Sequence, residues 1–162
     1  MTKDVLEGKR ILIVDDEPDV IETLKDLLTT CSLVEAYTFE DARDLFERES
    51  FDLAVLDIMG VDGYKLLEIA NDRNVPAVML TANALSVSHT VRSFKEGAAF
   101  YVPKEEIVHM ERFLKDILIA RKKGKSVGNR WLERMGSFYE KEFGPDWQGD
   151  DEEFWENFES RL

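Results

Sequence analysis

The stretch Leu53-Ala54-Val55-Leu56-Asp57 places four consecutive apolar residues directly before a single carboxylate. A short apolar run of this kind indicates a strand buried on both faces, with a buried helix as the alternative. Its length, and the turn-rich segment Gly60-Val61-Asp62-Gly63 after it, favour the strand. Asp57 is then expected at the carboxyl end of a central parallel strand, where open α/β sheets place their ligand sites. Taken alone, this aspartate could equally well end a strand or cap a helix.

Four other short apolar runs indicate further strands, and segments with helical spacing of apolar residues alternate with them. We expect strands at 10–14, 33–37, 53–57, 77–80 and 99–102, and helices at 18–28, 39–46, 63–70, 86–96 and 107–123. Alternation of five strands with five helices predicts an α/β fold in which helices cover both faces of a parallel sheet.

Polar residues follow four of the predicted strands, and the topology brings them to one edge of the sheet. They are Asp15 and Asp16, Asp57, Thr81 and Lys104. Three carboxylates in a small space repel one another, and a single lysine does not neutralise them, so a bound cation is expected. Oxygen ligands without histidine or cysteine suit Mg²⁺, which also accepts ligands from a substrate phosphate. A metal, a lysine and a hydroxyl around one carboxylate predict phosphoryl transfer onto that carboxylate.

These residues, in this order, resemble the receiver domain of two-component response regulators of the chemotaxis-regulator type. The resemblance covers about residues 9–123 and implies a flavodoxin-like, doubly wound sheet of five parallel strands with five helices. It rests on the following residues: Ile13-Val14-Asp15-Asp16-Glu17-Pro18, Asp57, Leu80-Thr81-Ala82, Gly97-Ala98, Tyr101 and Lys104.

The resemblance implies a metal site built from three aspartates and one backbone group. Asp16 would bind Mg²⁺ directly, and Asp15 would bind it largely through water. Asp57 and the backbone carbonyl of Met59 would complete the metal shell.

The resemblance also implies how the phosphoryl group is received and sensed. Asp57 would be the phosphoacceptor, and a phosphohistidine on a sensor histidine kinase or phosphotransfer protein would be the donor. Thr81 and Lys104 would contact the phosphoryl group, and Tyr101 would be an aromatic switch coupled to Thr81. Catalysis would be limited to self-phosphorylation and slow autodephosphorylation, and the output would be directed to a downstream protein target.

The sequence departs from the family pattern in two loops. The loop from Asp57 to Gly63 is shorter than usual and has no proline. Lys104 is followed by Glu105, whereas the family normally has a proline after a cis peptide bond. Because a cis bond before a residue other than proline costs roughly 2.5–4 kcal/mol, we predict a trans Lys104–Glu105 bond and an altered loop.

Residues 124–162 lie outside the resemblance, so we expect a receiver domain at 1–123 and a helical C-terminal extension at 124–162. Aromatic residues at helical spacing predict one helix over 131–143 and a second after Asp151. Eight of the chain's 17 aromatic residues lie here, in a segment too short for its own core. We expect the extension to fold back on the receiver or to pair in a homodimer. The alternative is a docking element for another protein.

Composition excludes several classes of function. The net charge of −13 argues against nucleic-acid binding, and no basic helix-turn-helix is present, so direct DNA binding is not expected. The single cysteine, Cys31, excludes an intramolecular disulfide. The N-terminus lacks the apolar core of a signal peptide, and no apolar run approaches the roughly 20 residues of a membrane span. A cytoplasmic protein without membrane association is expected.

Three other functions compete with a phosphorylation switch. A pseudo-receiver, acting as a binding module without phosphorylation, stays open because of the short loop after Asp57. An aspartyl-phosphate phosphatase resembling the haloacid dehalogenase group is less favoured, because such enzymes have a second aspartate where this chain has Met59. A nucleotide-binding flavodoxin relative is disfavoured by the absence of a phosphate loop rich in glycine, serine or threonine after the first strand.

Overall fold

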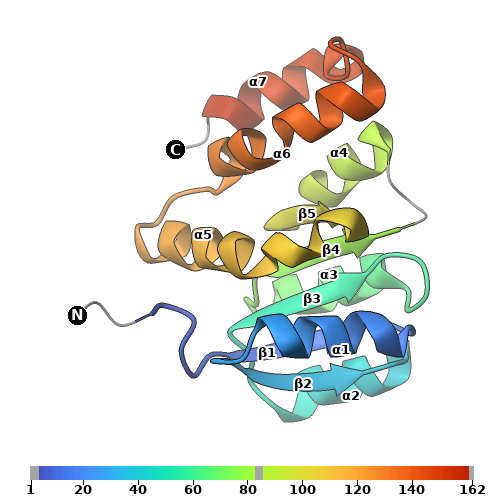
Figure 1. Ribbon diagram of the computed structural model, residues 1–162, viewed down its shortest axis with the longest axis vertical. Helices are drawn as coiled ribbons and strands as arrows, with labels where there is room; N and C mark the ends of the chain where they lie inside the picture. Colours follow the sequence, from blue (N-terminus) through green and yellow to red (C-terminus); the bar gives the residue numbers. More distant parts are fainter. Residues whose placement is uncertain (1–3, 83–85, 161–162) are drawn as a thin grey trace.

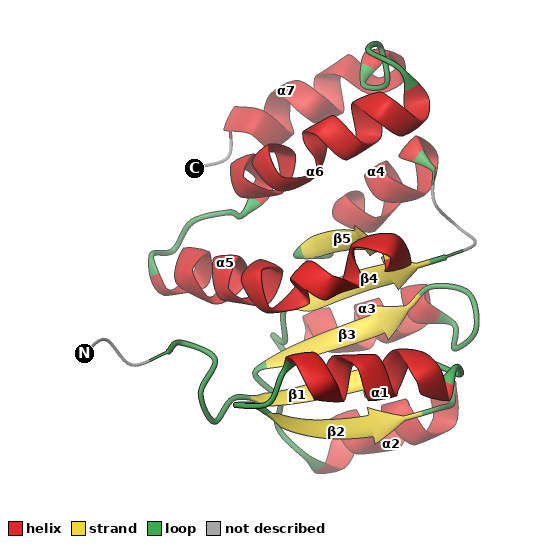
Figure 2. Ribbon diagram, viewed as in Figure 1, coloured by secondary structure: helices red, strands yellow, loops and turns green. Residues whose placement is uncertain are grey.

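A parallel sheet forms the centre of the computed structural model, which describes residues 4–82 and 86–160. Within these residues the sheet has five strands in the order β2-β1-β3-β4-β5, and every neighbouring pair is parallel, as the arrows in Figure 2 show. The strands are β1 (Arg10–Val14), β2 (Ser32–Ala36), β3 (Leu53–Asp57), β4 (Ala77–Thr81) and β5 (Phe100–Pro103). All five residues of the central strand β3 are buried, as its apolar run predicts.

Helices cover both faces of this sheet, so the predicted doubly wound α/β fold is confirmed. Figure 1 shows α1 and α5 in front of the sheet and α2, α3 and α4 behind it. Their bounds are α1 (Pro18–Leu27), α2 (Phe39–Arg48), α3 (Gly63–Asp72), α4 (Val87–Lys95) and α5 (Met110–Lys122). Crossovers between parallel strands are right-handed, so the helices change face where the chain reverses its direction across the sheet, after β2.

The starts of several helices follow from local side-chain chemistry. Pro18 occupies the first turn of α1, where its missing N–H is not needed. The Thr38 side chain accepts a hydrogen bond from the Asp41 N–H at the start of α2, at 3.2 Å. Ser86 caps α4 in the same way by accepting from the His89 N–H at 3.0 Å.

The segment after β5 differs from the sequence prediction. Residues Lys104–His109 form a 3-10 helix, η1, and the α-helix begins only at Met110, whereas a continuous helix was expected from residue 107. Pro103 precedes η1 with extended backbone and no side-chain cap, and 3-10 turns are frequent at the start of an α-helix. The described residues contain no cis peptide bond, which confirms the predicted trans Lys104–Glu105 bond.

The C-terminal extension lies over the β5 edge of the sheet, beside α4 and α5 (Figure 1). It consists of α6 (Gly128–Phe143), the short 3-10 helix η2 (Gly149–Asp151) and α7 (Glu152–Ser160). We call its ring cluster the aromatic cap. Its members are Trp131, Tyr139, Trp147, Trp155 and Phe158. The cap joins the same hydrophobic core as the sheet, so the extension folds back on the sheet and its helices, one of the two arrangements expected.

Membrane-spanning helices were not expected from the sequence. None of the helices in the described ranges combines the length and apolar character that crossing a bilayer requires.

Candidate functional site

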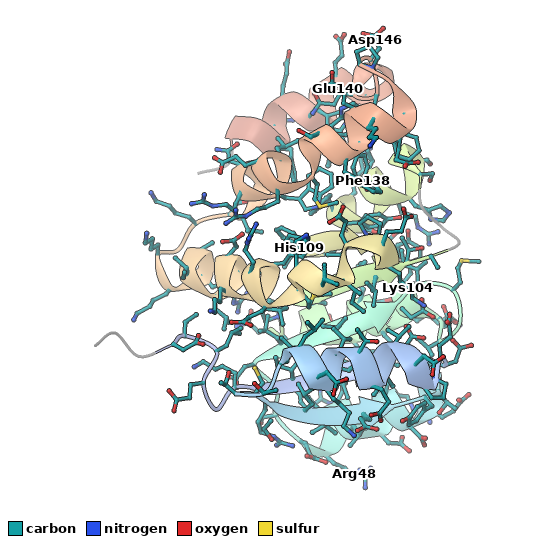
Figure 3. All side chains as sticks on the ribbon, viewed as in Figure 1. Arg48, Lys104, His109, Phe138, Glu140 and Asp146 are labelled. Carbon is teal, nitrogen blue, oxygen red and sulfur yellow. The ribbon has the colours of Figure 1, made fainter. Side chains whose placement is uncertain are left out.

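Four strand ends place the predicted site residues at one edge of the sheet. Asp15 follows β1 directly, Asp57 ends β3, Thr81 ends β4 and Lys104 follows β5. Strand register aligns these ends, because Asp57 is opposite Leu80 and Thr81 is opposite Pro103. Asp15 is fully buried and Asp57 is 6% exposed. Figure 3 shows Lys104 at the end of the sheet to which the strand arrows point.

Lys104 joins the carboxylates into one group. Its Nζ lies 3.1 Å from Oδ2 of Asp15, 3.5 Å from Oδ1 of Asp57 and 3.0 Å from Oε1 of Glu17. The sequence analysis gave no role to Glu17, although it directly follows Asp16 in the same turn. We call the group of Asp15, Asp16, Glu17, Asp57 and Lys104 the acidic pocket.

Two carboxylates of the acidic pocket, those of Asp15 and Asp57, have raised pKa values. Burial raises the pKa of Asp15 to about 6, and the negative charge of Asp57 adds to this shift. The Glu17 backbone N–H and Lys104 act in the opposite direction but do not cancel it. Burial likewise raises the pKa of Asp57, against the nearby positive charge of Lys104. One lysine therefore does not compensate the buried negative charge.

Burial opposes the charge on Lys104 itself, but its acidic neighbours outweigh this effect. The hydrogen bond to Glu17, together with the negative charges of Asp15 and Asp57, raises the pKa of Lys104. The lysine is therefore a stable cation within the pocket.

The pocket fits a hard divalent cation. Carboxylate oxygens of Asp15, Asp16 and Glu17 lie within 4.8 Å of one another. Oδ2 of Asp15 is buried and receives no hydrogen bond of acceptable geometry from the described residues, despite its ionic contact with Lys104. A buried carboxylate oxygen that has only an ionic contact with Lys104 to balance it, beside other carboxylates, is a suitable ligand for an ion that prefers oxygen.

The short loop after β3 is shaped by close contacts with the pocket. The Gly60 N–H donates a hydrogen bond of 3.2 Å to Oδ2 of Asp57. A Cβ atom at Gly60 would overlap the Asp16 carboxylate, and one at Gly63 would overlap the backbone of Asp57. Both glycines let the loop pass close to the carboxylates. The side chain of Met59 is exposed, and the metal-binding role of its carbonyl stays a prediction.

Thr81 and Tyr101 lie behind the pocket, both almost completely buried. Burial raises the pKa of the Tyr101 phenol, and hydrogen bonding with Thr90, the Ser86 backbone and Thr81 acts in the opposite direction. The predicted switch residue is therefore turned inward, in contact with Thr81. The sequence analysis did not identify Thr90, because one polar residue on an amphipathic helix carries no distinguishing pattern.

The residues and their arrangement define a receiver domain, and comparison with known proteins assigns the family. The family model of the response regulator receiver domain matches residues 11–117. The chain therefore belongs to this family and contains the receiver domain of a two-component response regulator.

Individual relatives agree with this assignment. The heme response regulator HssR of Staphylococcus aureus is 34% identical over 132 residues, which cover 75% of this chain and 58% of the relative. The chain thus spans less than two thirds of the length of the curated relatives that it matches. A CheY-like receiver domain protein from Methanospirillum hungatei is 30% identical, with a TM-score of 0.66 over 73% of this chain and 99% of that one. The receiver domain of DrrB, activated with BeF3, is 26% identical, with a TM-score of 0.55 over 67% of this chain and 98% of that one.

Proposed function

We propose that the chain is a phosphorylation-dependent switch in which Asp57 accepts a phosphoryl group while Mg²⁺ is bound. The donor is a phosphohistidine on a sensor histidine kinase or a phosphotransfer protein. Asp15, Asp16, Asp57 and the Met59 carbonyl hold the metal ion. Because Mg²⁺ keeps several of its waters and takes phosphate oxygens as ligands, this acidic set suits it.

The position of Lys104 carries the proposal. Its ammonium group lies beside both Asp15 and Asp57, and it can move to the oxygens of an incoming phosphoryl group. Thr81, at the end of the neighbouring strand β4, supplies a hydroxyl beside Asp57. These cationic and hydrogen-bonding groups offset charge on a transferring phosphoryl group, which is the main task of a protein in this chemistry.

The reaction is a transfer between two nucleophiles. A carboxylate oxygen of Asp57 forms a bond to phosphorus as the phosphorus–nitrogen bond of the phosphohistidine breaks, and the electron pair of that bond stays on the imidazole. The product is an acyl phosphate on Asp57, which water hydrolyses slowly to regenerate the carboxylate. The chain carries out no other catalysis in this proposal.

Output follows from a change in the population of two conformations. A phosphoryl group draws in Thr81 and Lys104, and the inward position of Tyr101 is favoured in the phosphorylated state. A downstream protein reads this difference. The acidic composition of the chain, with a net charge of −13, does not support direct readout by DNA.

Incubation with Mg²⁺ and acetyl phosphate, followed by intact mass measurement, tests the proposal. We expect one added phosphoryl group on the wild type and none on Asp57→Asn. Asp44→Asn is the matched control, because Asp44 is an exposed carboxylate paired with Arg43 on α2, and it should accept phosphoryl as the wild type does. An unmodified wild type, or an undiminished modification of Asp57→Asn, would contradict the proposal and favour a pseudo-receiver that acts as a binding module.

A further inference from the structure

The extension makes specific polar contacts with the part of the receiver that contains the switch. The Trp131 indole N–H donates a hydrogen bond of 2.8 Å to the backbone carbonyl of Tyr101. Arg134 of α6 lies 3.1 Å from Asp116 of α5, and a second guanidinium nitrogen also reaches that carboxylate. These contacts fix α6 against β5 and α5.

A third contact links α6 to α4 through two buried hydroxyls. The oxygens of Tyr139 and Thr90 are 2.6 Å apart, and both side chains are fully buried. The Thr90 hydroxyl also lies 2.7 Å from the Ser86 carbonyl, to which it must donate its single proton. Tyr139 is therefore the donor to Thr90. A buried hydroxyl pair of this kind fixes the position of α4 relative to α6, because separating the two leaves polar groups unpaired.

Tyr101, the predicted switch residue, is bonded directly by one of these contacts. Its backbone carbonyl lies on the edge strand β5, where the Trp131 indole satisfies it. Its phenol is fully buried, and Thr90 and Thr81 both act to lower the pKa of that phenol, so both hydroxyls lie near it. Buried groups on β5 and α4 thus lie between Thr81, at the end of β4, and Tyr139 in the extension.

Apolar packing holds the extension in the same place. Phe94 of α4 lies with its ring centroid 5.1 Å from that of Trp131 and 4.7 Å from that of Phe158. Only residues 123–127 separate α5 from α6, so the extension is tethered close to its docking face. A short tether gives a high effective concentration, which favours docking in the absence of any other partner.

We propose that the extension is an intramolecular partner of the switch: α6 stabilises the inward position of Tyr101 and thereby raises the affinity of the Asp57 site for a phosphoryl group. The proposal rests on the phosphoacceptor function of Asp57. In thermodynamic terms, the docked extension increases the fraction of unphosphorylated chains that already adopt the conformation favoured by phosphorylation. Coupling is reciprocal, so a phosphoryl group on Asp57 tightens the docking of α6 by the same factor.

Beryllofluoride with Mg²⁺ mimics the phosphoryl group and serves as the probe in full-length variants. Tyr139→Phe removes the hydroxyl that reaches Thr90 and keeps the ring. We expect it to weaken beryllofluoride affinity by about threefold to tenfold, since the lost hydrogen bond favours the arrangement that binds the probe. Tyr37→Phe is the matched control: Tyr37 is exposed and bonded to Glu35, far from α6 in sequence, and its replacement should leave the affinity unchanged.

A double-mutant cycle separates coupling from a local structural effect. In a Thr90→Val background, Tyr139→Phe should cause little further loss of beryllofluoride affinity, because both changes break the same contact. Trp131→Phe, which removes the bond to the Tyr101 carbonyl, should weaken the affinity independently of Thr90. If thermal unfolding shows that Tyr139→Phe does not fold, Trp131→Phe serves as the test variant in its place.

The outcomes distinguish this inference from the proposed function. If the wild type binds beryllofluoride, and both Tyr139→Phe and Trp131→Phe bind it equally tightly or more tightly, the inference is wrong while the phosphoacceptor function stands. If the wild type neither binds beryllofluoride nor accepts phosphoryl from acetyl phosphate, the proposed function fails and the inference fails with it.

Discussion

In the acidic pocket a fully buried Asp15 lies among other carboxylates, whereas in the aromatic cap the buried side chains are mostly apolar rings. The pKa of Asp15 is raised to about 6, so its charged form is disfavoured by the fold. In the cap, by contrast, Trp131 and Tyr139 place their polar atoms on good partners. The pocket therefore reduces stability, as expected of a site proposed to bind a cation and a phosphoryl group, and the cap supplies stability beside it.

Replacing Trp131, at the centre of the aromatic cap, should give the largest change in stability. Trp131 is fully buried, contacts several rings and bonds the Tyr101 carbonyl. We expect Trp131→Ala to lower the free energy of unfolding by about 3–5 kcal/mol, measured by urea denaturation. Phe143→Ala, at an exposed position at the end of the same helix, is the control and should cost less than about 1 kcal/mol. Equal losses in the two variants would show that the cap does not stabilise the fold in the way described.

Removing the negative charge of Asp15 should raise the stability of the fold, whereas Trp131→Ala lowers it. The pKa of Asp15 is about 6 in the folded chain and near its ordinary value in the unfolded chain, so ionisation of Asp15 opposes folding. This cost is absent below about pH 4, grows between about pH 4 and 6, and is complete above that range. We therefore expect Asp15→Asn to raise the free energy of unfolding at pH 7 by roughly 1–3 kcal/mol without added metal, and the gain to vanish towards pH 4.

Mg²⁺ provides the internal control for this prediction. In the proposed function the ion binds the folded wild type, so saturating Mg²⁺ should stabilise the wild type and should have little effect on Asp15→Asn. Thermal unfolding at several pH values, with and without Mg²⁺, measures both quantities. A variant that is less stable than the wild type at pH 7 without metal would contradict the electrostatic account of the pocket.

A substitution in the loop after β3, Gly60→Ala, should change Mg²⁺ affinity without changing stability. An alanine Cβ at residue 60 would overlap the carboxylate of Asp16, a flexible and exposed side chain that can turn away. We expect Gly60→Ala to weaken Mg²⁺ affinity by about tenfold, measured by calorimetry, with little change in stability. Gly136→Ala is the control, because nothing lies within 4 Å of a Cβ there, and Mg²⁺ affinity should be unchanged. Unaltered Mg²⁺ binding in Gly60→Ala would exclude Asp16 as a metal ligand.

The sequence was sufficient to predict the receiver fold and the convergence of the pocket residues. The apolar run of β3 gives its bounds correctly, and parallel topology alone brings Asp15, Asp57, Thr81 and Lys104 to one edge. The 3-10 turn after Lys104 was missed, because helical periodicity does not distinguish the two kinds of helix over six residues.

The position of the extension could not be predicted from local patterns. Aromatic spacing shows that α6 must bury one face, but not what covers it. The contacts that decide this join residues 30 and 49 positions apart, Trp131 to Tyr101 and Tyr139 to Thr90. Neither pair leaves a periodic signal in the sequence. Glu17 was missed as a partner of Lys104 for a similar reason, since that contact spans 87 positions.

Tryptophan fluorescence tests the link between the two regions most directly, because all three tryptophans of the chain lie in the extension. The wild type would be titrated with beryllofluoride in the presence of Mg²⁺, and occupancy of the Asp57 site would be followed in parallel by fluorine NMR. We predict a tryptophan signal that changes with the same affinity as site occupancy, and that is absent in Asp57→Asn. An occupied site with unchanged tryptophan fluorescence would contradict the coupling between the acidic pocket and the aromatic cap.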